Sequence, residues 1–303
     1  MKIGIVGFGA IAKRVYLPLY LDNKNIDEIF VCGRNIKKLE KRLNYYNFHL
    51  YDEFEKMLEQ VDCLMVHSAT VSHYDYIKTA LKKHIPVYVD KPLTDDTIRS
   101  KELIEIAKDT NTLLFVGYNR RFAPLYLEVK KMELSPYKIH YEKHRSTLTN
   151  DENYETAIID DFIHLIDTVV DLNHKQIKLK SSRVNTTKED ELLSLYVDLS
   201  NADQINTLFM SRESSNDYEK VTIHAKDQVV TVEDMRVLKI LKNNKETIVK
   251  INERLSDSQI RGFENTLNAF FNQVKENVFS ESKQLDSELL CFEVVEYLKA
   301  TKQ

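Results

Sequence analysis

Four polar side chains recur at helical spacing within one segment of this chain: Asp160, His164, Asp167 and Asp171. Positions i, i+4, i+7 and i+11 share one face of a helix, so these groups would form a polar stripe along an otherwise apolar helix. An imidazole changes its protonation near neutral pH, and a carboxylate one turn away can orient the ring or bind a hydroxyl group. We therefore predict that His164 transfers a proton and that Asp160 supports it. The alternative is a hydrogen-bonded core histidine.

Lys91 is a second candidate for chemistry, because it follows a short apolar run and directly precedes Pro92. Ligands of open α/β sheets bind at the carboxyl ends of strands, where a lysine can hydrogen-bond a reacting oxygen and stabilise its negative charge. Burial beside a cationic group would lower the pKa of this lysine, so Lys91 could instead be the base. The sequence leaves both roles open, and the alternative to both is a surface lysine.

The glycine-rich segment 7–12 is a third set, and it lies directly after the first apolar run and at the start of a helical pattern. It fits the pattern G-x-G-x-x-G/A, in which Gly7 permits a tight turn and Gly9 lets backbone amides approach a pyrophosphate. Ala12 is small enough for the helix to pack on the strand. The segment therefore predicts a bound dinucleotide, contacted by Gly7, Phe8, Gly9, Ala10, Ile11 and Ala12.

The end of the second predicted strand indicates which dinucleotide binds. NAD-binding domains usually place an acidic residue there for the ribose hydroxyls, but Cys32, Gly33, Arg34 and Asn35 offer none. Arg34 can stack on adenine and donate paired hydrogen bonds to a 2′-phosphate, and Gly33 leaves room for that group. We therefore predict NADP as the favoured cofactor, with NAD possible.

Charge and composition exclude several classes of function. Lys and Arg number 43 against 47 Asp and Glu, which gives a net charge of −4, and 43% of the residues are hydrophobic. The chain is neither basic enough to suggest nucleic acid as a partner nor polar enough to be disordered. With no leader-like start and no apolar run of membrane-spanning length, we expect a cytoplasmic protein without membrane association. Three scattered cysteines are too few for a disulfide framework or a zinc site, and we predict no metal.

The segments that must position these residues alternate between short apolar runs and helical patterns over residues 1–120. Such runs are typical of βαβ units and of a parallel sheet that is covered on both faces. We therefore predict an α/β, doubly wound Rossmann domain over residues 1–120 that binds the dinucleotide. The predicted strands are residues 3–6, 29–32, 63–66, 86–89 and 113–116, and the predicted helices are residues 11–21, 36–43, 74–83 and 98–108.

The pattern changes after residue 120, where one helix over residues 157–173 is surrounded by strand-like segments, several of them alternating. The tail is helical over about 256–299, with an apolar face. We predict an α+β domain over residues 121–303 that binds the substrate and whose open, mainly antiparallel sheet forms a homo-oligomer, a dimer or tetramer. The predicted strands are residues 138–147, 177–186, 191–199, 204–212, 217–224, 227–232 and 235–250.

Four short motifs occur in the same order as in one enzyme family. Residues 90–92, Asp-Lys-Pro, match a Glu-Lys-Pro motif, and residues 117–124 match G-[FY]-x-x-R-F-x-P at a crossing between domains. Residues 160–167 match D-x-G-x-H-x-x-D with Phe162 in place of the glycine, and residues 68–73 match T-P-x-x-x-H more weakly. Across most of its length the chain thereby resembles the glucose-fructose oxidoreductase and inositol dehydrogenase family of NAD(P)-dependent enzymes.

The resemblance implies hydride transfer between a nicotinamide cofactor and a small hydroxylated or carbonyl substrate, a sugar or cyclic polyol. It implies cofactor contacts by Ser68, Thr70, His73, Asp90, Lys91, Pro92 and Arg121. It implies substrate contacts by Lys91, Tyr118, Asn119, Asp160 and His164. As an alternative, His73 is a structural residue at the start of a helix.

Two residues depart from the family pattern. Asp90 is one methylene shorter than glutamate, which alters how the ribose or Lys91 is held. Phe162 either narrows the pocket or packs in the core. A second candidate function is a non-catalytic NADP(H)-binding sensor or regulatory protein, although such a protein would need neither Lys91 nor His164.

Overall fold

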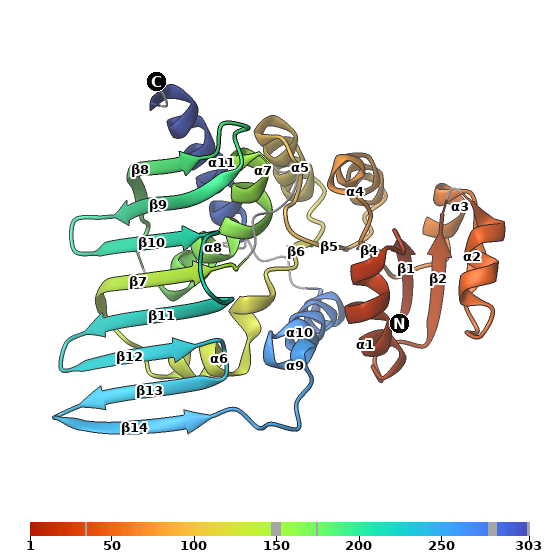
Figure 1. The fold of residues 1–303 in the computed structure, drawn as a ribbon. Helices are drawn as coiled ribbons and strands as arrows, with labels where there is room; N and C mark the ends of the chain where they lie inside the picture. The colour runs from red at the N-terminus through yellow and green to blue at the C-terminus, as the bar shows by residue number, and fades with distance from the viewer. Residues whose placement is uncertain (34, 147–152, 174, 278–283, 302–303) are drawn as a thin grey trace. The chain divides into compact units, whose positions relative to one another are not determined.

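The computed structural model describes residues 1–33, 35–146, 153–173, 175–277 and 284–301, which form two compact units (Figure 1). The first unit contains residues 1–117 and helix α10 (Phe263–Glu276). The second contains residues 118–262 and helix α11 (Gln284–Thr301). None of the helices in these described ranges has both the length and the apolar composition needed to cross a membrane.

The first unit is built on a parallel six-stranded sheet with the order β3-β2-β1-β4-β5-β6. This order confirms the predicted doubly wound fold. Its strands are β1 (Lys2–Val6), β2 (Glu28–Cys32), β3 (His49–Tyr51), β4 (Cys63–Val66), β5 (Val87–Val89) and β6 (Leu114–Val116). Its other helices are η1 (Ala12–Tyr16), α1 (Leu17–Leu21), α2 (Ile36–Leu43), α3 (Phe54–Leu58), η2 (Thr70–Ser72), α4 (His73–Lys82) and α5 (Thr97–Asp109).

The strand order reverses between β1 and β4, because the chain continues from β1 to one side of the sheet and returns to the other side at β4. All six strands run in the same direction, so the loops that follow β1, β4 and β5 lie at one edge of the sheet. This is the edge at which doubly wound sheets bind ligands. The segments 7–12, 68–73 and 90–92, which were predicted above to contact a cofactor, follow β1, β4 and β5 at this edge.

Helix α10 lies on the same face of the parallel sheet as α1, and α4 and α5 cover the opposite face (Figure 1). Phe263 meets the ring of Tyr16 with centroids 5.6 Å apart, and Phe270 meets the rings of Tyr88 and Phe115 at 5.6 and 5.8 Å. Such edge-on aromatic contacts are typical of a well-packed core. A segment from the end of the chain thus completes the core of the first unit.

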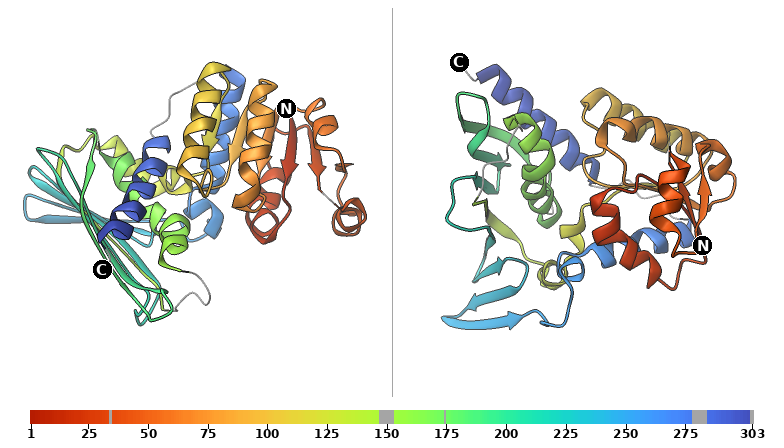
Figure 2. Two further views of the ribbon diagram at one scale, coloured as in Figure 1. Left: turned by 90° about the horizontal axis from the view of Figure 1, so that it is seen from above. Right: turned by 45° about the vertical axis from the view of Figure 1, so that its right-hand side comes forward.

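The second unit contains an eight-stranded sheet with the order β14-β13-β12-β11-β7-β10-β9-β8, in which β7 and β10 pair in parallel and the other neighbours pair antiparallel. This confirms the mainly antiparallel sheet, and its helices gather on one face (Figure 2). The strands are β7 (Pro136–His144), β8 (Lys178–Thr186), β9 (Leu192–Ser200), β10 (Ile205–Ser211), β11 (Tyr218–Ala225), β12 (Gln228–Glu233), β13 (Val237–Lys242) and β14 (Lys245–Lys250).

Two segments expected to be continuous are divided in the structure. The strand expected over residues 235–250 is a hairpin of β13 and β14, because Asn243 and Asn244 have φ angles of 52° and 59° and form a two-residue turn. The helix expected over residues 256–299 consists of α9 (Asp257–Ile260), α10 and α11. Gly262 has a φ of +86°, a left-handed conformation that ends α9 before α10 begins.

The helix expected over residues 157–173 also changes its geometry along its length. It comprises α7 (Tyr154–Ala157), the π-helical turn η4 (Ile158–Phe162) and α8 (Ile163–Leu172). A π-helical turn inserts one extra residue, so side chains before and after it no longer share the face that α-helical spacing predicts. This turn carries Asp160, and α8 begins immediately before His164.

Candidate active site

The glycine-rich loop after β1 has the backbone that the dinucleotide pattern requires. Gly7 has a φ of +84°, and a Cβ added there would lie 2.2 Å from the backbone nitrogen of Ser68. A Cβ added at Gly9, by contrast, would meet nothing within 4 Å. Gly7 is therefore needed for the fold of the loop, whereas Gly9 leaves open space beside the start of a helix, the place where a pyrophosphate binds. These residues fit a dinucleotide.

The other residues of segment 7–12 differ in how exposed they are, because a helix begins within the segment. Helical structure begins at Ala10, and the π-helical turn η1 continues it from Ala12. Ala12 is buried against the sheet, as its small size predicted, and Phe8 is also buried. Ile11 is 44% exposed at the same edge of the sheet. The exposed surface at this loop is thus formed by Gly9, Ala10 and Ile11.

The structure describes only some of the residues that were predicted to set the preference for NADP over NAD. A Cβ at Gly33 would lie 2.7 Å from the Leu39 side chain, so close packing against α2 is one reason for this glycine. Arg34 lies outside the described residues. Its proposed contact with a 2′-phosphate therefore stays a prediction.

The loop after β4 is tied to the loop after β5 by His73. Its side chain is 1% exposed, with Nδ1 3.1 Å from the carbonyl oxygen of Pro92 and Nε2 3.0 Å from that of Ser68. Burial lowers the pKa of His73. These contacts fit the structural role at the start of α4, one of the two alternatives that the sequence left open, and a cofactor contact by His73 stays a prediction. Ser68 and Thr70 are half-buried at the same edge, and their cofactor contacts stay predictions.

Sequence reasoning missed a polar network around Asp90. One oxygen of its carboxylate accepts a hydrogen bond from the hydroxyl of Tyr16, and the other lies 2.8 Å from Nδ1 of His67. Nε2 of His67 lies 2.5 Å from the Tyr20 hydroxyl. The substitution of aspartate for the family's glutamate was the available signal, because the shorter side chain reaches these inward partners. Lys91, half-buried, follows directly.

In the second unit, the residues of segment 118–121 that were predicted to contact substrate or cofactor already bind other residues of the unit. Tyr118 is fully buried and its hydroxyl donates to Glu288, while Asn119 donates to the carbonyl oxygen of Arg261 at 2.8 Å. Arg121 donates to Asp167 at 2.6 Å. The roles of Tyr118 and Asn119 toward substrate, and of Arg121 toward cofactor, stay predictions.

The polar stripe expected on residues 160–171 divides into two parts. Asp167 is buried and binds Arg121, so it holds the helix in place, and burial raises its pKa. Asp160 is exposed on η4, and His164 is half-buried at the start of α8. Phe162 is fully buried, which favours packing in the core over narrowing of a pocket. Asp171 is half-buried and lies 2.9 Å from Lys130. Asp160 and His164 are thus the two members of the stripe that are at least partly exposed at its N-terminal end.

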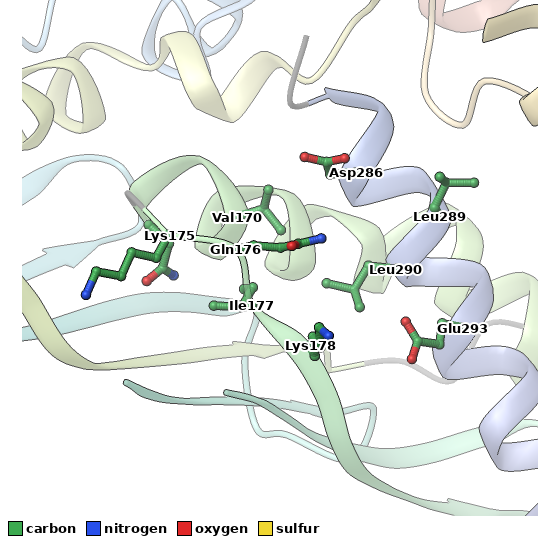
Figure 3. Close-up of a pocket in the computed structure, with 10 residues that line it drawn as sticks. Val170, Lys175, Gln176, Ile177, Lys178, Asp286, Leu289, Leu290 and Glu293 are labelled. Carbon is green, nitrogen blue, oxygen red and sulfur yellow. The ribbon is translucent and has the colours of Figure 1, made fainter. Parts of the chain in front are cut away.

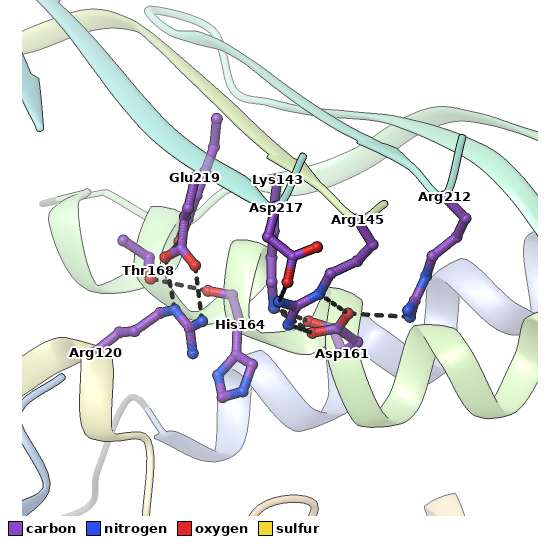
Figure 4. Close-up of polar contacts among 10 residues, drawn as sticks. Arg120, Lys143, Arg145, Asp161, His164, Thr168, Arg212, Asp217 and Glu219 are labelled. Atoms are coloured by element: carbon purple, nitrogen blue, oxygen red, sulfur yellow. Dashed lines mark hydrogen bonds and ion pairs between the residues drawn. The ribbon is translucent and has the colours of Figure 1, made fainter. Parts of the chain in front are cut away.

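A second cluster that the sequence did not reveal surrounds Asp161 (Figure 4). Lys143 donates to its carboxylate, Arg212 lies 3.0 Å from it, and Arg145 lies 3.2 Å from it. Although burial opposes ionisation, Lys143 and Arg145 hold the pKa of Asp161 well below its ordinary range. Figure 4 shows the His164 imidazole on the side of α8 away from these ion pairs. The cluster therefore anchors η4 to the sheet.

Two further charged groups adjoin this cluster. Arg120 donates two hydrogen bonds to Glu219, at 2.7 and 2.8 Å, and is 3% exposed. Although burial opposes it, the Arg120 guanidinium holds the pKa of Glu219 at about 2. Burial and the same guanidinium lower the pKa of Lys143 to about 7.

A pocket of about 620 Å³ lies in the second unit between the end of α8, the start of β8 and α11 (Figure 3). Val170, Ile177 and Leu290 form part of its wall, with Lys178 and Glu293 at its rim. Among the described residues that line it, none was predicted to contact cofactor or substrate.

Comparisons with known proteins agree with the two-unit architecture. A family profile described as "Oxidoreductase family, NAD-binding Rossmann fold" matches residues 1–118, and one described as "YceM-like, C-terminal domain" matches residues 124–243. The putative oxidoreductase YceM of Salmonella typhimurium is 28% identical over 237 residues, which cover 78% of this chain and 77% of that protein.

Two further proteins are similar to this chain. An inositol 2-dehydrogenase/D-chiro-inositol 3-dehydrogenase of Lactiplantibacillus plantarum is 28% identical over 55% of this chain and 50% of its own length. The crystal structure of a Gfo/Idh/MocA family oxidoreductase from Vibrio cholerae matches with a TM-score of 0.87 and 25% identity over the whole of both chains. Over its full length the chain is therefore similar to oxidoreductases of the Gfo/Idh/MocA family, and its residues 1–118 match that family's NAD-binding Rossmann domain.

Proposed function

We propose that this protein is an NADP-preferring oxidoreductase that transfers a hydride to or from a small sugar or cyclic polyol. The observation that carries the proposal is the loop after β1, where Gly7 cannot bear a side chain and Gly9 leaves open space at a helix start. The nicotinamide group of the cofactor would supply the hydride donor or acceptor. The named activity of the inositol dehydrogenase relative supports a polyhydroxylated substrate.

In this proposal, residues 1–120 bind the cofactor and residues 121–303 bind the substrate. Segment 7–12, Ser68, Thr70 and Lys91 hold the pyrophosphate and ribose side of the cofactor, and Arg34 binds the 2′-phosphate. Lys91 donates a hydrogen bond to the reacting oxygen and stabilises its charge, and His164 removes or returns the hydroxyl proton. Asp160, one turn before His164 and exposed, orients the imidazole or holds a neighbouring hydroxyl group.

The location and assembly of the protein complete the proposal. We place it in the cytoplasm, with a small-molecule substrate and no nucleic-acid or membrane partner. The face of the second unit's sheet opposite its helices carries half-buried side chains such as Phe209, Tyr196 and Thr222. A homo-oligomer, a dimer or tetramer, would bury this face.

The preference for NADP is tested by titrating NADPH and NADH and following the fluorescence of the reduced cofactor. Charge-assisted hydrogen bonds to a phosphate are worth about 1.5–3 kcal/mol, so NADPH should bind roughly 10- to 100-fold more tightly than NADH. Arg34→Ala should remove this difference without weakening NADH. Equal affinities of the unaltered protein for both cofactors would overturn the assignment.

The alternative of a non-catalytic sensor makes a different prediction for the same preparation. A sensor would bind NADPH but would turn over no member of a panel of sugars, inositols and short aldehydes. The named activities of the relatives favour an enzyme.

A further inference from the structure

We propose that His67 and Tyr16 are positioning residues that hold Asp90 and thereby fix the catalytic Lys91. This proposal rests on the function proposed above and adds two residues to its machinery. It is carried by the buried contacts among the ends of β4 and β5 and the helix after the glycine-rich loop, all within the first unit.

Both oxygens of the Asp90 carboxylate are already bound inside the protein. Oδ1 accepts the hydroxyl proton of Tyr16, and Oδ2 lies 2.8 Å from Nδ1 of His67. A carboxylate that accepts hydrogen bonds on both oxygens is fixed in rotation. The side chain is 18% exposed, so it is directed into the unit and not toward solvent.

The hydrogen bonds on His67 place a proton on Nδ1. Nδ1 faces a carboxylate, which only accepts, so Nδ1 carries the proton. Nε2 lies 2.5 Å from the Tyr20 hydroxyl, which can either donate to it or accept from it. The ring stacks on that of Tyr16 with centroids 4.0 Å apart. Both ring nitrogens of His67 therefore have a hydrogen-bond partner inside the unit.

The residues on the other side of Lys91 are also held by a histidine. His73 approaches the carbonyl oxygens of Pro92 and Leu93 at 3.1 and 3.2 Å. Lys91 therefore lies in the chain between two anchored positions, Asp90 and Pro92. The two anchors come from one loop, since His67 and His73 stand at its two ends.

The network also accounts for the glycine at position 117, and it connects the three loops that are predicted to contact the cofactor. The Tyr16 hydroxyl, which donates to Asp90, accepts from the Tyr88 hydroxyl at 3.0 Å, and a Cβ at Gly117 would lie 2.4 Å from the Tyr88 hydroxyl oxygen. Tyr16 belongs to η1, which follows the glycine-rich loop, while His67 and Asp90 follow β4 and β5. One buried network thus sets the loops after β1, β4 and β5 relative to each other, and it compensates for the shorter acid at position 90.

The test compares two tyrosines that lie four residues apart and are equally buried. Tyr16→Phe removes the hydrogen bond to Asp90, whereas Tyr20→Phe removes a hydroxyl from the same network without touching Asp90. His67→Ala removes the second bond, and His67→Asn keeps an N–H near the position of Nδ1. His49→Ala, at an exposed histidine in the same unit, is the control for histidine loss.

The first readout is the rate at which a succinimidyl ester acylates Lys91, measured by mass spectrometry against exposed Lys101. This rate depends on neither cofactor nor substrate, so it separates the present proposal from the proposed function. Tyr16→Phe and His67→Ala should change the Lys91 rate several-fold, whereas Tyr20→Phe, His49→Ala and His67→Asn should leave it close to that of the unaltered protein. Equal rates in all variants would overturn the proposal.

The second readout is turnover with a substrate from the panel described above. Small displacements of a catalytic group cost up to about 100-fold in rate, so we expect Tyr16→Phe and His67→Ala to lower kcat at least tenfold with a smaller change in the KM for cofactor. His67→Asn should recover part of kcat. A fall in kcat that is the same for Tyr16→Phe and Tyr20→Phe would indicate general loss of packing and would contradict a positioning role.

Discussion

Gly7 and Gly9 of the glycine-rich loop differ in the atoms that an added methyl group would contact. This difference allows the effect of each glycine on folding to be separated from its effect on cofactor binding. A Cβ at Gly7 would overlap backbone atoms of Ser68, and the φ of +84° disfavours any L side chain. Gly7→Ala should therefore destabilise the protein and abolish cofactor binding. Gly9→Ala should leave the thermal midpoint unchanged, because the space is open, and should still weaken NADPH binding by at least about tenfold.

Thermal unfolding and NADPH titration of both variants check this prediction. The informative variant is Gly9→Ala, since its stability is expected to be that of the unaltered protein. Unchanged NADPH affinity in Gly9→Ala would show that the cofactor does not approach this loop.

The two adjacent acids of η4 make a second matched pair at the scale of the element. Asp161 is held by Lys143 and Arg212, and its loss would leave buried cations without a carboxylate. Asp161→Asn should therefore lower the free energy of unfolding by about 3–5 kcal/mol. Asp160 is exposed, so Asp160→Asn should change stability by no more than about 0.5 kcal/mol while lowering kcat.

Urea unfolding and turnover of the two variants provide the measurement. Consecutive residues of a helix face different directions, so Asp161 faces the sheet while Asp160 lies at the surface. A stable Asp161→Asn variant, or an unstable Asp160→Asn variant, would show that this turn is not anchored as described.

The elements predicted from sequence were those with a short-range signal. Buried strands such as β4 and β5 were found because four apolar residues in a row need two covered faces. Strand β3, residues 49–51, has no such run and was missed. The π-helical turn was missed as well, because the polar residues at positions 160, 164, 167 and 171 were interpreted with regular α-helical spacing.

The candidate site was predicted to the extent that its residues lie in local motifs. The loop at residues 7–12 and the order of the motifs followed from spacing alone. The partners of Asp90 did not, because Tyr16 lies 74 positions away from it in sequence and only the fold brings the two together. The same holds for Glu219, which is 99 positions from Arg120.

At the scale of the whole molecule, the buried ion pairs predict a loss of stability in acid. Glu219 has a folded pKa of about 2 against an ordinary value of 4.5, and the pKa of Asp161 is lowered as well. A carboxyl group whose pKa is lowered by folding stabilises the protein above its unfolded pKa and loses that contribution as the pH falls through the folded pKa. The free energy of unfolding should therefore fall between about pH 4.5 and pH 2.

Urea unfolding midpoints measured from pH 6 to pH 2 check this expectation. Glu219→Gln should be less stable at neutral pH, since Arg120 loses its partner, and should depend less steeply on pH in the acid range. Glu189→Gln, at an exposed position, is the control. The same slope in Glu219→Gln and in the unaltered protein would show that this pair does not govern the acid limit.

Turnover is the most direct test of the proposed NADP-dependent oxidoreductase activity. The measurement follows NADPH consumption or formation with a panel of sugars, inositols and short aldehydes, using the unaltered protein, Lys91→Ala and His164→Ala. We predict turnover of at least one polyhydroxylated substrate and a loss of about 100-fold or more in each variant, as expected when a group that stabilises charge or transfers a proton is removed. No turnover by the unaltered protein, or equal turnover by all three proteins, would contradict the account.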